Sequence, residues 1–465
     1  MDAMSEDTRV NRRNFLKIGG LAAMTLPAVK VVASSGGKEF VSSEETYGKY
    51  LVRRQSNGHR SEHLVDPEKF ERFDQVNEAF NRANWDEEFQ KTFPPDGDFG
   101  NVDDPLKPGY RREDLALSDA AWTIAGAFGT GSGMNGYHQG LYSLDNLEGP
   151  EPGEPWDHSY LSSEELTQRV KTAALFFGAS LVGITELDEK WLYSRYSSMD
   201  EVDRQGEIRY VEAEKAEYLE DGTLVIPRSY KHCIVMAYEM DYDGYRLSPG
   251  ANASAATGNG YSRMAFTGAS LAQFIRYLGY GAVPCGNNTG LSVPMAIDAG
   301  LGEKSRMGCL VTPKYGPRVR LNKLFTDMPL DHDAPISFGV SEFCEVCKKC
   351  AVNCPSGAIT EGDQSYTSDN ISNIQGVYKW QNDMEKCFRF WMENGTDCSI
   401  CLGICPFNKQ EGWLHEATRI LIGAQVGSLD KLLVRLDEAS GFGQLPSDEE
   451  TLAFWKKKDF IHIKP

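Results

Sequence analysis

The alternation of hydrophobic and polar positions predicts a domain of mixed helices and strands in the middle of the chain. Apolar residues recur at helical spacing over residues 166–177, directly after Ser162-Ser163-Glu164-Glu165, which has the form of a capping box. Short β-rich stretches bounded by turn residues predict strands at 181–185, 223–226 and 233–237. Two further helices are predicted, one that ends at Gly279 and one bracketed by Pro294 and Gly300.

The flanking regions have weaker patterns. Residues 34–155 are polar and punctuated by glycine, proline and charge, which predicts a wrapping extension rather than a separate core. Within them, residues 115–128 are more apolar, and the glycine-rich run 129–136 that follows lacks the Lys-Ser or Lys-Thr ending of a phosphate-binding loop. A flexible loop is therefore favoured there. Residues 412–465 predict a helical tail.

Eight of the 11 cysteines lie in one stretch that has the spacing of a double iron–sulfur module. The first run reads Cys344-Glu-Val-Cys347-Lys-Lys-Cys350-Ala-Val-Asn-Cys354-Pro355, and the second reads Cys398-Ser-Ile-Cys401-Leu-Gly-Ile-Cys405-Pro406. In bacterial ferredoxins three cysteines of such a run bind one [4Fe–4S] cluster, and the fourth, before a proline, binds the other. The second run is a variant, because ten residues separate its first cysteine, Cys387, from Cys398 where the plain pattern has two.

This crossed ligation predicts two clusters. Cluster 1 is assigned Cys344, Cys347, Cys350 and Cys405, and cluster 2 is assigned Cys387, Cys398, Cys401 and Cys354. A zinc site would need only two pairs of ligands, and a disulfide framework is typical of short secreted chains. The remaining cysteines, at 233, 285 and 309, are expected to be packed, reduced thiols.

Composition and the amino terminus narrow the class of protein. A chain of 465 residues can hold two or three structural units, and its formal charge of −19 argues against a nucleic-acid partner. Arg12-Arg13-Asn14-Phe15-Leu16-Lys17 precedes a modestly apolar run and the small-residue pattern Val31-Val32-Ala33, which predicts a twin-arginine export signal. The apolar run is too short for a membrane span, which favours export over anchoring. That route carries folded proteins, as a protein with clusters inserted in the cytoplasm requires.

The densest candidate chemistry precedes the cysteines. The four segments are Thr257-Gly-Asn-Gly-Tyr261-Ser-Arg-Met, Phe274-Ile-Arg-Tyr-Leu-Gly-Tyr280-Gly-Ala-Val-Pro-Cys-Gly-Asn287, Ala299-Gly-Leu-Gly-Glu303 and Pro313-Lys-Tyr-Gly-Pro-Arg318-Val-Arg320. Together with the cysteine runs and the export signal, they closely resemble the catalytic subunit of corrinoid-dependent reductive dehalogenases, nearest to the tetrachloroethene-reducing type. The resemblance covers residues 166–407 and is weaker in the first 150 residues.

The resemblance implies an α+β fold in which a nitroreductase-like, corrinoid-binding domain precedes a bacterial ferredoxin-like module, with wrapping amino- and carboxyl-terminal extensions. The expected segments are a signal peptide (1–33), an extension (34–155), the corrinoid domain (156–335), the two-cluster module (336–411) and the helical tail (412–465). The cofactors implied are two [4Fe–4S] clusters and a base-off corrinoid without a cobalt-ligating histidine. No Asp-x-His-x-x-Gly signature is present, which agrees with that implication.

The resemblance also implies roles for individual residues. Tyr261 matches the proton donor, Asn287 the position beside the substrate halogen, and Arg320 a positive charge next to the tyrosine, with Arg318 as its rival. A guanidinium would stabilise the phenolate that remains after proton transfer. The corrinoid and pocket contacts implied are Thr257, Gly308, Leu310, Thr312, Trp122 and Trp391. For each residue taken alone, ordinary packing, a turn or a surface ion pair is the alternative interpretation.

The function implied is the two-electron, one-proton replacement of a carbon–halogen bond by carbon–hydrogen in anaerobic organohalide respiration. The expected partners are a small halogenated organic substrate, a small integral-membrane anchor protein and a membrane electron donor, and a homodimer is allowed. The enzyme is expected as a peripheral protein on the outer face of the cytoplasmic membrane. Small chlorinated aliphatics are preferred as substrates, with aromatics left open. The alternatives are an epoxyqueuosine reductase, which shares the corrinoid domain and clusters, and a ferredoxin-type electron carrier.

Overall fold

The computed structural model describes residues 64–95, 106–126, 161–197, 205–408, 427–439 and 443–458, with short pieces at 40–41, 52–54, 104, 418–419, 421–423 and 460. The predicted export signal and the glycine-rich run 129–136 lie outside the described residues. No described helix is both long and apolar enough to cross a membrane.

A four-stranded antiparallel sheet forms the centre of the protein. Its strands, in spatial order, are β3 (Leu181–Glu186), β8 (His232–Glu239), β12 (Val319–Thr326) and β9 (Ala282–Pro284). Strand β8 is buried on both faces because its side chains alternate between two cores. Residues 233, 235 and 237 join one hydrophobic cluster, and residues 234, 236 and 238 join the other.

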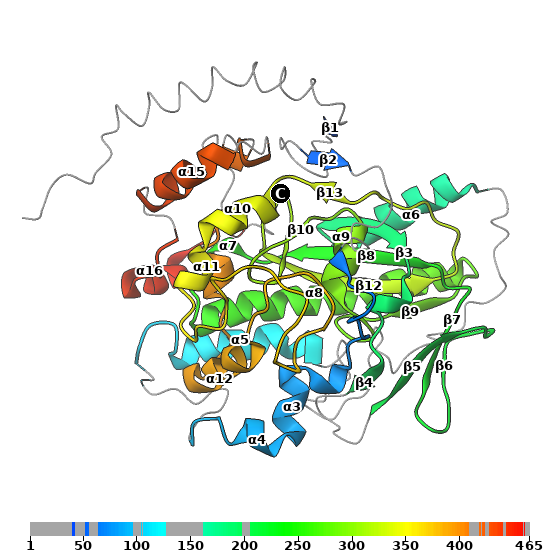
Figure 1. Ribbon diagram of the computed structural model, residues 1–465, viewed down its shortest axis with the longest axis horizontal. Helices are drawn as coiled ribbons and strands as arrows, with labels where there is room; N and C mark the ends of the chain where they lie inside the picture. The colour runs from blue at the N-terminus through cyan, green and yellow to red at the C-terminus, as the bar shows by residue number, and fades with distance from the viewer. Residues whose placement is uncertain are drawn as a thin grey trace, which may run out of the picture.

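Helices cover both faces of this sheet, which confirms the α+β prediction. Helices α6 (Ser163–Phe176) and α8 (Ala251–Tyr277) supply apolar residues to the core on one face, and α9 (Ser292–Asp298) supplies the core on the other. Figure 1 shows α8 running lengthwise through the middle of the molecule with α5 (Arg112–Ile124) beside it. The amino-terminal extension thus contributes a helix directly to the centre.

The predicted elements of the central region are confirmed. Ser162 caps α6 by accepting from the Glu165 backbone N–H at 3.2 Å, while the Glu165 carboxylate accepts from the Ser162 N–H at 2.9 Å. Helix α8 ends before Gly279, whose φ of +85° is left-handed. This helix begins at Ala251, well ahead of the apolar spacing, so the glycines at 258 and 260 lie inside a helix. They are tolerated there because neighbouring side chains press closely against them.

Smaller elements complete the described structure (Figure 1). A second sheet joins β4 (Arg195–Ser197), β5 (Gln205–Val211), β7 (Leu224–Pro227) and β6 (Glu217–Tyr218), with β5 and β7 parallel. Two short sheets join β1 (Phe40–Val41), β2 (Val52–Arg54) and β13 (Ile336–Ser337), and β10 (Glu303–Lys304) with β11 (Leu310–Val311). Other helices are η2 (Gln75–Asn77), α3 (Ala79–Trp85), α4 (Glu87–Gln90), η4 (Glu189–Trp191), α7 (Tyr242–Tyr245), α15 (Gly427–Ala439), α16 (Asp448–Ala453) and η5 (Phe454–Lys456).

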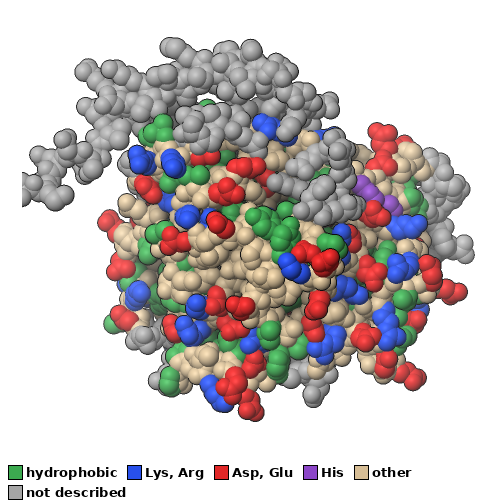
Figure 2. Space-filling model, in the orientation of Figure 1, with side chains coloured by type: hydrophobic (Ala, Val, Ile, Leu, Met, Phe, Trp, Pro, Cys, Tyr) green, Lys and Arg blue, Asp and Glu red, His purple; other side chains and the backbone are tan. Residues whose placement is uncertain are grey.

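The cysteine-rich region consists of short helices and loops. Its helices are α10 (Val340–Cys347), α11 (Lys349–Val352), α12 (Met384–Asn394) and α13 (Ile400–Gly403). Lys348 has a left-handed φ of +52° and separates α10 from α11. The chain therefore changes direction between Cys347 and Cys350. On the outer surface, Figure 2 shows acidic and basic side chains mixed over the face it presents rather than one large basic area.

Candidate active site

Three side chains predicted to act together meet at the end of the central sheet. The Asn287 amide donates to the Tyr261 hydroxyl at 2.5 Å, and the Arg320 guanidinium donates to the same oxygen at 3.4 Å. The Cζ atom of Arg320 lies 5.2 Å from the centre of the Tyr261 ring. Two donors therefore converge on one phenol oxygen, an arrangement that stabilises a phenolate.

Each of these residues is positioned by a different element. Tyr261 lies in the middle of α8, Arg320 lies on β12 opposite Tyr238 of β8, and Asn287 lies in the turn after β9. The amino-terminal extension also holds this turn, because the Gln75 side-chain amide donates to Asn288 Oδ1 at 2.9 Å. The site therefore depends on residues from distant parts of the chain.

Trp122 covers the tyrosine. Its ring stacks on Tyr261 with centroids 4.8 Å apart and an interplanar angle of 28°, and its indole N–H donates to Ser254 at 3.3 Å. The close approach requires a glycine, because a Cβ built on Gly258 would lie 2.6 Å from the Trp122 ring. The structure thus places Trp122 at the tyrosine, where the sequence predicted a pocket wall.

The structure distinguishes Arg320 from its rival Arg318. Arg318 is buried and pairs with Glu239 at 2.6 Å, while its Nε donates to Asn408 at 3.0 Å, which is a structural ion pair. Arg320 has no such partner among the described ion pairs. Burial disfavours its charge, yet the nearby hydroxyls of Tyr261 and Tyr245 outweigh that effect and raise the pKa of Arg320 above its ordinary value.

The eight predicted cluster cysteines gather beside this site as free thiols. Burial raises the pKa of Cys344, and the neighbouring thiols that raise it further are Cys405, Cys350 and Cys347, the other three residues assigned to cluster 1. Burial likewise raises the pKa of Cys387 to about 12, and the thiols that raise it further are Cys398, Cys354 and Cys309. Cys309 belongs to neither predicted set, and Cys401 is influenced by Cys350 of the first run. The division of the eight cysteines between two clusters therefore stays a prediction.

Buried thiols of this kind fit a bound cluster. Taking a thiolate out of water is costly unless a metal takes up its charge. Among the described residues, no group of three or more His, Cys, Asp or Glu side chains is arranged to hold a metal ion. The fit to a cluster therefore rests on the burial and spacing of the thiols.

Cys309 and Tyr245 connect cluster 2 with the tyrosine site. Burial raises the pKa of Cys309, and the Arg320 charge acts in the opposite direction. Burial also raises the pKa of Tyr245, a side chain close enough to feel both Arg320 and Cys401. Tyr245 is therefore close both to a predicted cluster 2 ligand and to the Arg320 guanidinium.

Trp391 lies on the wall of a cavity of about 310 Å³ next to cluster 2. It comes from α12, within the insertion between Cys387 and Cys398, and packs on Phe80 of the extension with ring centroids 5.4 Å apart. The complete lining is Phe73, Glu78, Ala79, Phe80, Leu291, Ser372, Asn373, Ile374, Lys379, Met384, Cys387, Phe388 and Trp391. Trp391 thus lies beside Cys387, a predicted cluster 2 ligand, on the lining of this cavity.

The other predicted corrinoid contacts have mixed surroundings. Thr257 is buried, and its hydroxyl has no partner among the described residues. Gly308 has a φ of +84° in the turn before Cys309, and Leu310 is buried on β11. Thr312 is already engaged, since its hydroxyl donates to Gly316 O at 3.1 Å and accepts from the Tyr315 N–H at 3.0 Å. The backbone here is engaged as well, since the Gly308 N–H donates to Ser305 O at 3.0 Å and both the N–H and the C=O of Thr312 bond to Gly316.

Unpartnered polar atoms close to the site fit a large polar cofactor. The Tyr245, Thr257 and Ser399 hydroxyls are buried without a hydrogen-bond partner among the described residues. Such groups are rare in a native interior unless water or a ligand satisfies them. The residues present therefore fit a bound group in this region.

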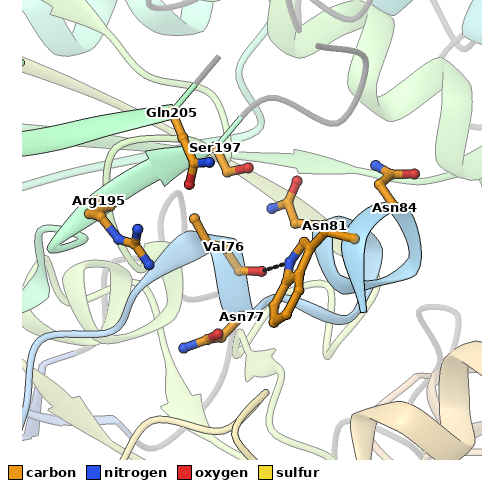
Figure 3. Close-up of a pocket in the computed structure, with 8 residues that line it drawn as sticks. Val76, Asn77, Asn81, Asn84, Arg195, Ser197 and Gln205 are labelled. Atoms are coloured by element: carbon orange, nitrogen blue, oxygen red, sulfur yellow. Dashed lines mark hydrogen bonds between the residues drawn. The ribbon is translucent and has the colours of Figure 1, made fainter. Parts of the chain in front are cut away.

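A second cavity, of about 320 Å³, lies between the amino-terminal extension and the sheet that contains β4 and β5. Figure 3 shows Val76, Asn77, Asn81 and Asn84 on one side of it and Arg195, Ser197 and Gln205 on the other. None of the predicted site residues lines it. It offers amides and one guanidinium but no thiol or tyrosine, so it is not part of the redox site.

Sequence reasoning missed several residues around the tyrosine. Tyr193 is buried against Phe73, and its hydroxyl donates to Asn287 O at 3.4 Å. Glu78 is close to Tyr193, and Lys323 is close to Glu78. Burial raises the pKa of Glu78 to about 7 and lowers that of Lys323 to about 8. No spacing pattern links these positions, so only the folded chain could have identified them.

Comparison with known proteins identifies the cysteine-rich region first. Residues 343–408 match the model of the 4Fe-4S double cluster binding domain, which supports both predicted clusters. Joined to a converging Tyr261, Asn287 and Arg320, this domain defines an iron–sulfur oxidoreductase.

The relatives identify the family. The chain is 34% identical to the tetrachloroethene reductive dehalogenase of Sulfurospirillum multivorans over 468 residues, which cover 93% of this chain and 91% of that protein. It is 37% identical to a tetrachloroethene reductive dehalogenase of Desulfitobacterium hafniense over 67% of this chain and 60% of that protein. The chain therefore belongs to the reductive dehalogenases, oxidoreductases that act on carbon–halogen bonds, as the sequence predicted.

Solved structures agree on the fold. A catabolic reductive dehalogenase matches with a TM-score of 0.61 at 22% identity, covering 86% of this chain. Another, whose structure suggests a mechanism for B12-dependent dehalogenation, matches with a TM-score of 0.61 at 23% identity. The chain spans half the length of each of these proteins. By contrast, an epoxyqueuosine reductase of Listeria monocytogenes is 26% identical over only 25% of this chain, which disfavours that alternative.

Proposed function

We propose that this protein reduces the carbon–halogen bond of a small organohalide, with Tyr261 as the proton donor. The observation that carries the proposal is the convergence of the Asn287 amide and the Arg320 guanidinium on the Tyr261 hydroxyl, close to a cluster 2 ligand. The reaction consumes two electrons and one proton and releases halide. A proton donor held beside an electron relay meets both needs.

The chain's own residues supply positioning and charge. The Arg320 charge favours the phenolate left when Tyr261 gives up its proton, and the Asn287 amide donates a second hydrogen bond to it. Asn287 is exposed in the turn after β9, where it is available to a halogen substituent. Trp122 stacks on the tyrosine ring and excludes water from that side.

Two [4Fe–4S] clusters and a base-off corrinoid are the cofactors that the residues fit. A bound corrinoid would supply low-valent cobalt, which reduces carbon–halogen bonds. Thr257, Gly308, Leu310 and Thr312, and the Trp122 and Trp391 rings would hold it. The relative whose structure concerns B12-dependent dehalogenation supports this assignment. The central sheet with α8 would then be a nitroreductase-like corrinoid domain within residues 156–335, between the predicted extension and the two-cluster module.

The substrate and the cellular setting form the outer part of the proposal. Relatives named for tetrachloroethene favour chlorinated ethenes or similar aliphatics. The Arg12-Arg13 motif supports twin-arginine export, with the mature enzyme peripheral on the outer face of the cytoplasmic membrane. A small membrane anchor protein and a membrane electron donor would then serve anaerobic organohalide respiration.

The decisive test compares Tyr261→Phe with the unaltered holoprotein. Halide release with reduced viologen and tetrachloroethene should fall by at least about 10²-fold, because a general acid contributes that much. Iron and cobalt content should not change, since Tyr261 is assigned to neither metal. Tyr277→Phe is the matched control, because this residue is 50% exposed at the end of the same helix. Undiminished turnover in Tyr261→Phe would remove the tyrosine from the mechanism.

A further inference from the structure

Arg306 is a buried guanidinium beside the ligands of cluster 1. It is 2% exposed. Its Nε donates to Cys344 O at 3.1 Å, and its Nη1 donates to Thr360 O at 2.9 Å and to Gly362 O at 2.8 Å. Its Cζ lies 4.8 Å from the centre of the Trp380 ring. All four partners are neutral, and one of them is the backbone of a cluster ligand.

The charge of Arg306 is fixed and has no ion-pair partner among the described residues. Two other buried cations are neutralised locally, since Arg318 pairs with Glu239 at 2.6 Å and Lys349 pairs with Asp437 at 2.5 Å. A guanidinium stays protonated in proteins, and burying one without a carboxylate is costly. Neutral carbonyl groups accept the hydrogen bonds of the Arg306 guanidinium, and the Trp380 ring packs against it, but none of these groups neutralises its positive charge.

Arg306 is close enough to the cluster 1 ligands for its charge to act on them. Its guanidinium acts on Cys350, and its Nε donates to Cys344 O. Cys347 feels Lys349 together with the acids Asp437 and Glu438, and Lys349 is itself paired with Asp437. Among the described residues, Arg306 is thus a buried cation beside cluster 1 that no carboxylate neutralises.

Cluster 2 has neighbours of both signs, because Tyr245 is close to both Arg320 and Cys401. Asp383 acts on Cys387 and Asp397 acts on Cys398. Reduction adds one electron to a cluster, and a nearby positive charge stabilises the reduced form while a negative charge opposes it.

We propose that Arg306 raises the reduction potential of cluster 1. Arg306 is a positioning residue here, acting on the cluster through its field and through the Cys344 backbone. The inference rests on the two-cluster part of the proposed function and not on dehalogenation. A higher potential lets cluster 1 accept an electron from a weaker one-electron donor.

The test is an EPR-monitored redox titration of the holoprotein carrying both clusters. In Arg306→Met the midpoint potential of cluster 1 should move to a more negative value, and that of cluster 2 should move much less. Arg306→Lys keeps the charge, so its cluster 1 midpoint should stay close to that of the unaltered protein. Signals are assigned with Cys398→Ser, which alters the spectrum of cluster 2.

The same titration contains the results that would overturn the inference. An unchanged cluster 1 midpoint in Arg306→Met, or equal shifts of both clusters, would show that Arg306 sets no difference between them. Should Arg306→Met assemble no cluster 1, Arg306→Gln decides by the same criterion, because its amide can still donate to a neighbouring carbonyl but carries no charge. Absence of halide release with the expected potentials would refute the proposed function alone.

Discussion

At the residue scale, the site places charged and titratable groups where water cannot reach them easily. Arg320 keeps its charge because Tyr261 and Tyr245 stabilise it, whereas Lys323 and Glu78 are pushed toward neutrality by burial. Glu78 also lines the cavity next to cluster 2 and accepts from the Asn81 amide at 3.3 Å. The pH dependence of protein stability should therefore report the burial of the Glu78 carboxyl group.

Glu78 should make stability depend on pH. Burial raises its folded-state pKa from the ordinary 4.5 to about 7, and the Lys323 charge offsets this only in part. The folded protein holds the proton of the Glu78 carboxyl group more tightly than the unfolded chain does. The protonated carboxyl group therefore contributes fully to the free energy of unfolding below about pH 4.5, and this contribution is lost as pH rises through 7. Glu78→Gln should therefore stabilise the holoprotein at pH 8.5, by at most about 3 kcal/mol, and much less at pH 5.

The measurement for Glu78→Gln is the melting temperature as a function of pH, compared with the unaltered protein. Glu220→Gln, on the exposed turn between β6 and β7, is the control and should leave the pH profile unchanged. A melting-temperature difference for Glu78→Gln that does not vary with pH would show that the carboxyl is solvated as in water.

At the scale of elements, α5 and α8 form the rigid wall of the site. Asn252 of α8 donates to the Asp114 carboxylate of α5 at 3.1 Å, and the Ser262 hydroxyl donates to Ala121 O at 2.6 Å. Between these contacts, Trp122 reaches over Gly258 to Tyr261. These contacts between α5 and α8 explain why the amino-terminal extension, which has little sequence pattern of its own, is needed at the active site.

Gly258→Ala tests this packing. Alanine favours a helix by about 1 kcal/mol over glycine, but its methyl group would lie 2.6 Å from the Trp122 ring. Displacing that ring should lower halide release on the order of 10- to 10²-fold, because misplacement of about 1 Å at a reacting group costs that much. Steady-state rates and far-UV circular dichroism check the prediction together. Normal rates with intact helicity would mean that Trp122 does not position the tyrosine.

At the scale of the whole molecule, segments from both ends of the chain pack on the cysteine-rich module. The amino-terminal extension packs on the two-cluster module through Phe80 and Phe388, whose ring centroids are 5.1 Å apart. The tail does so through the buried Lys349–Asp437 pair. The clusters are therefore enclosed by segments that begin and end far apart in the chain.

Crossed ligation predicts opposite effects of two cysteine variants. Cys354→Ser, although it lies in the first run, should disrupt cluster 2, and Cys405→Ser in the second run should disrupt cluster 1. Each variant should lose iron from the about eight atoms that two [4Fe–4S] clusters contain. Iron analysis and EPR distinguish the two losses. Loss of cluster 1 in Cys354→Ser would reverse the assignment.

The sequence by itself determined the parts of this protein that depend on local spacing. The capping box, the turn glycines and the strand patterns predicted the central α+β elements, and the cysteine spacing predicted both clusters. These signals are readable because helix caps, left-handed turns and cluster ligation each impose residue types at fixed separations. Tyr261, Asn287 and Arg320 could be named only through resemblance.

The tertiary structure alone decided which distant residues share one environment. It brought Gln75 to Asn288, Glu78 to Lys323 and Trp122 to Tyr261, contacts between segments with no common pattern. It also showed that Arg318 is neutralised while Arg306 is not. Burial and the presence of a counter-charge are properties of the folded chain, because they depend on what surrounds a side chain rather than on what precedes it.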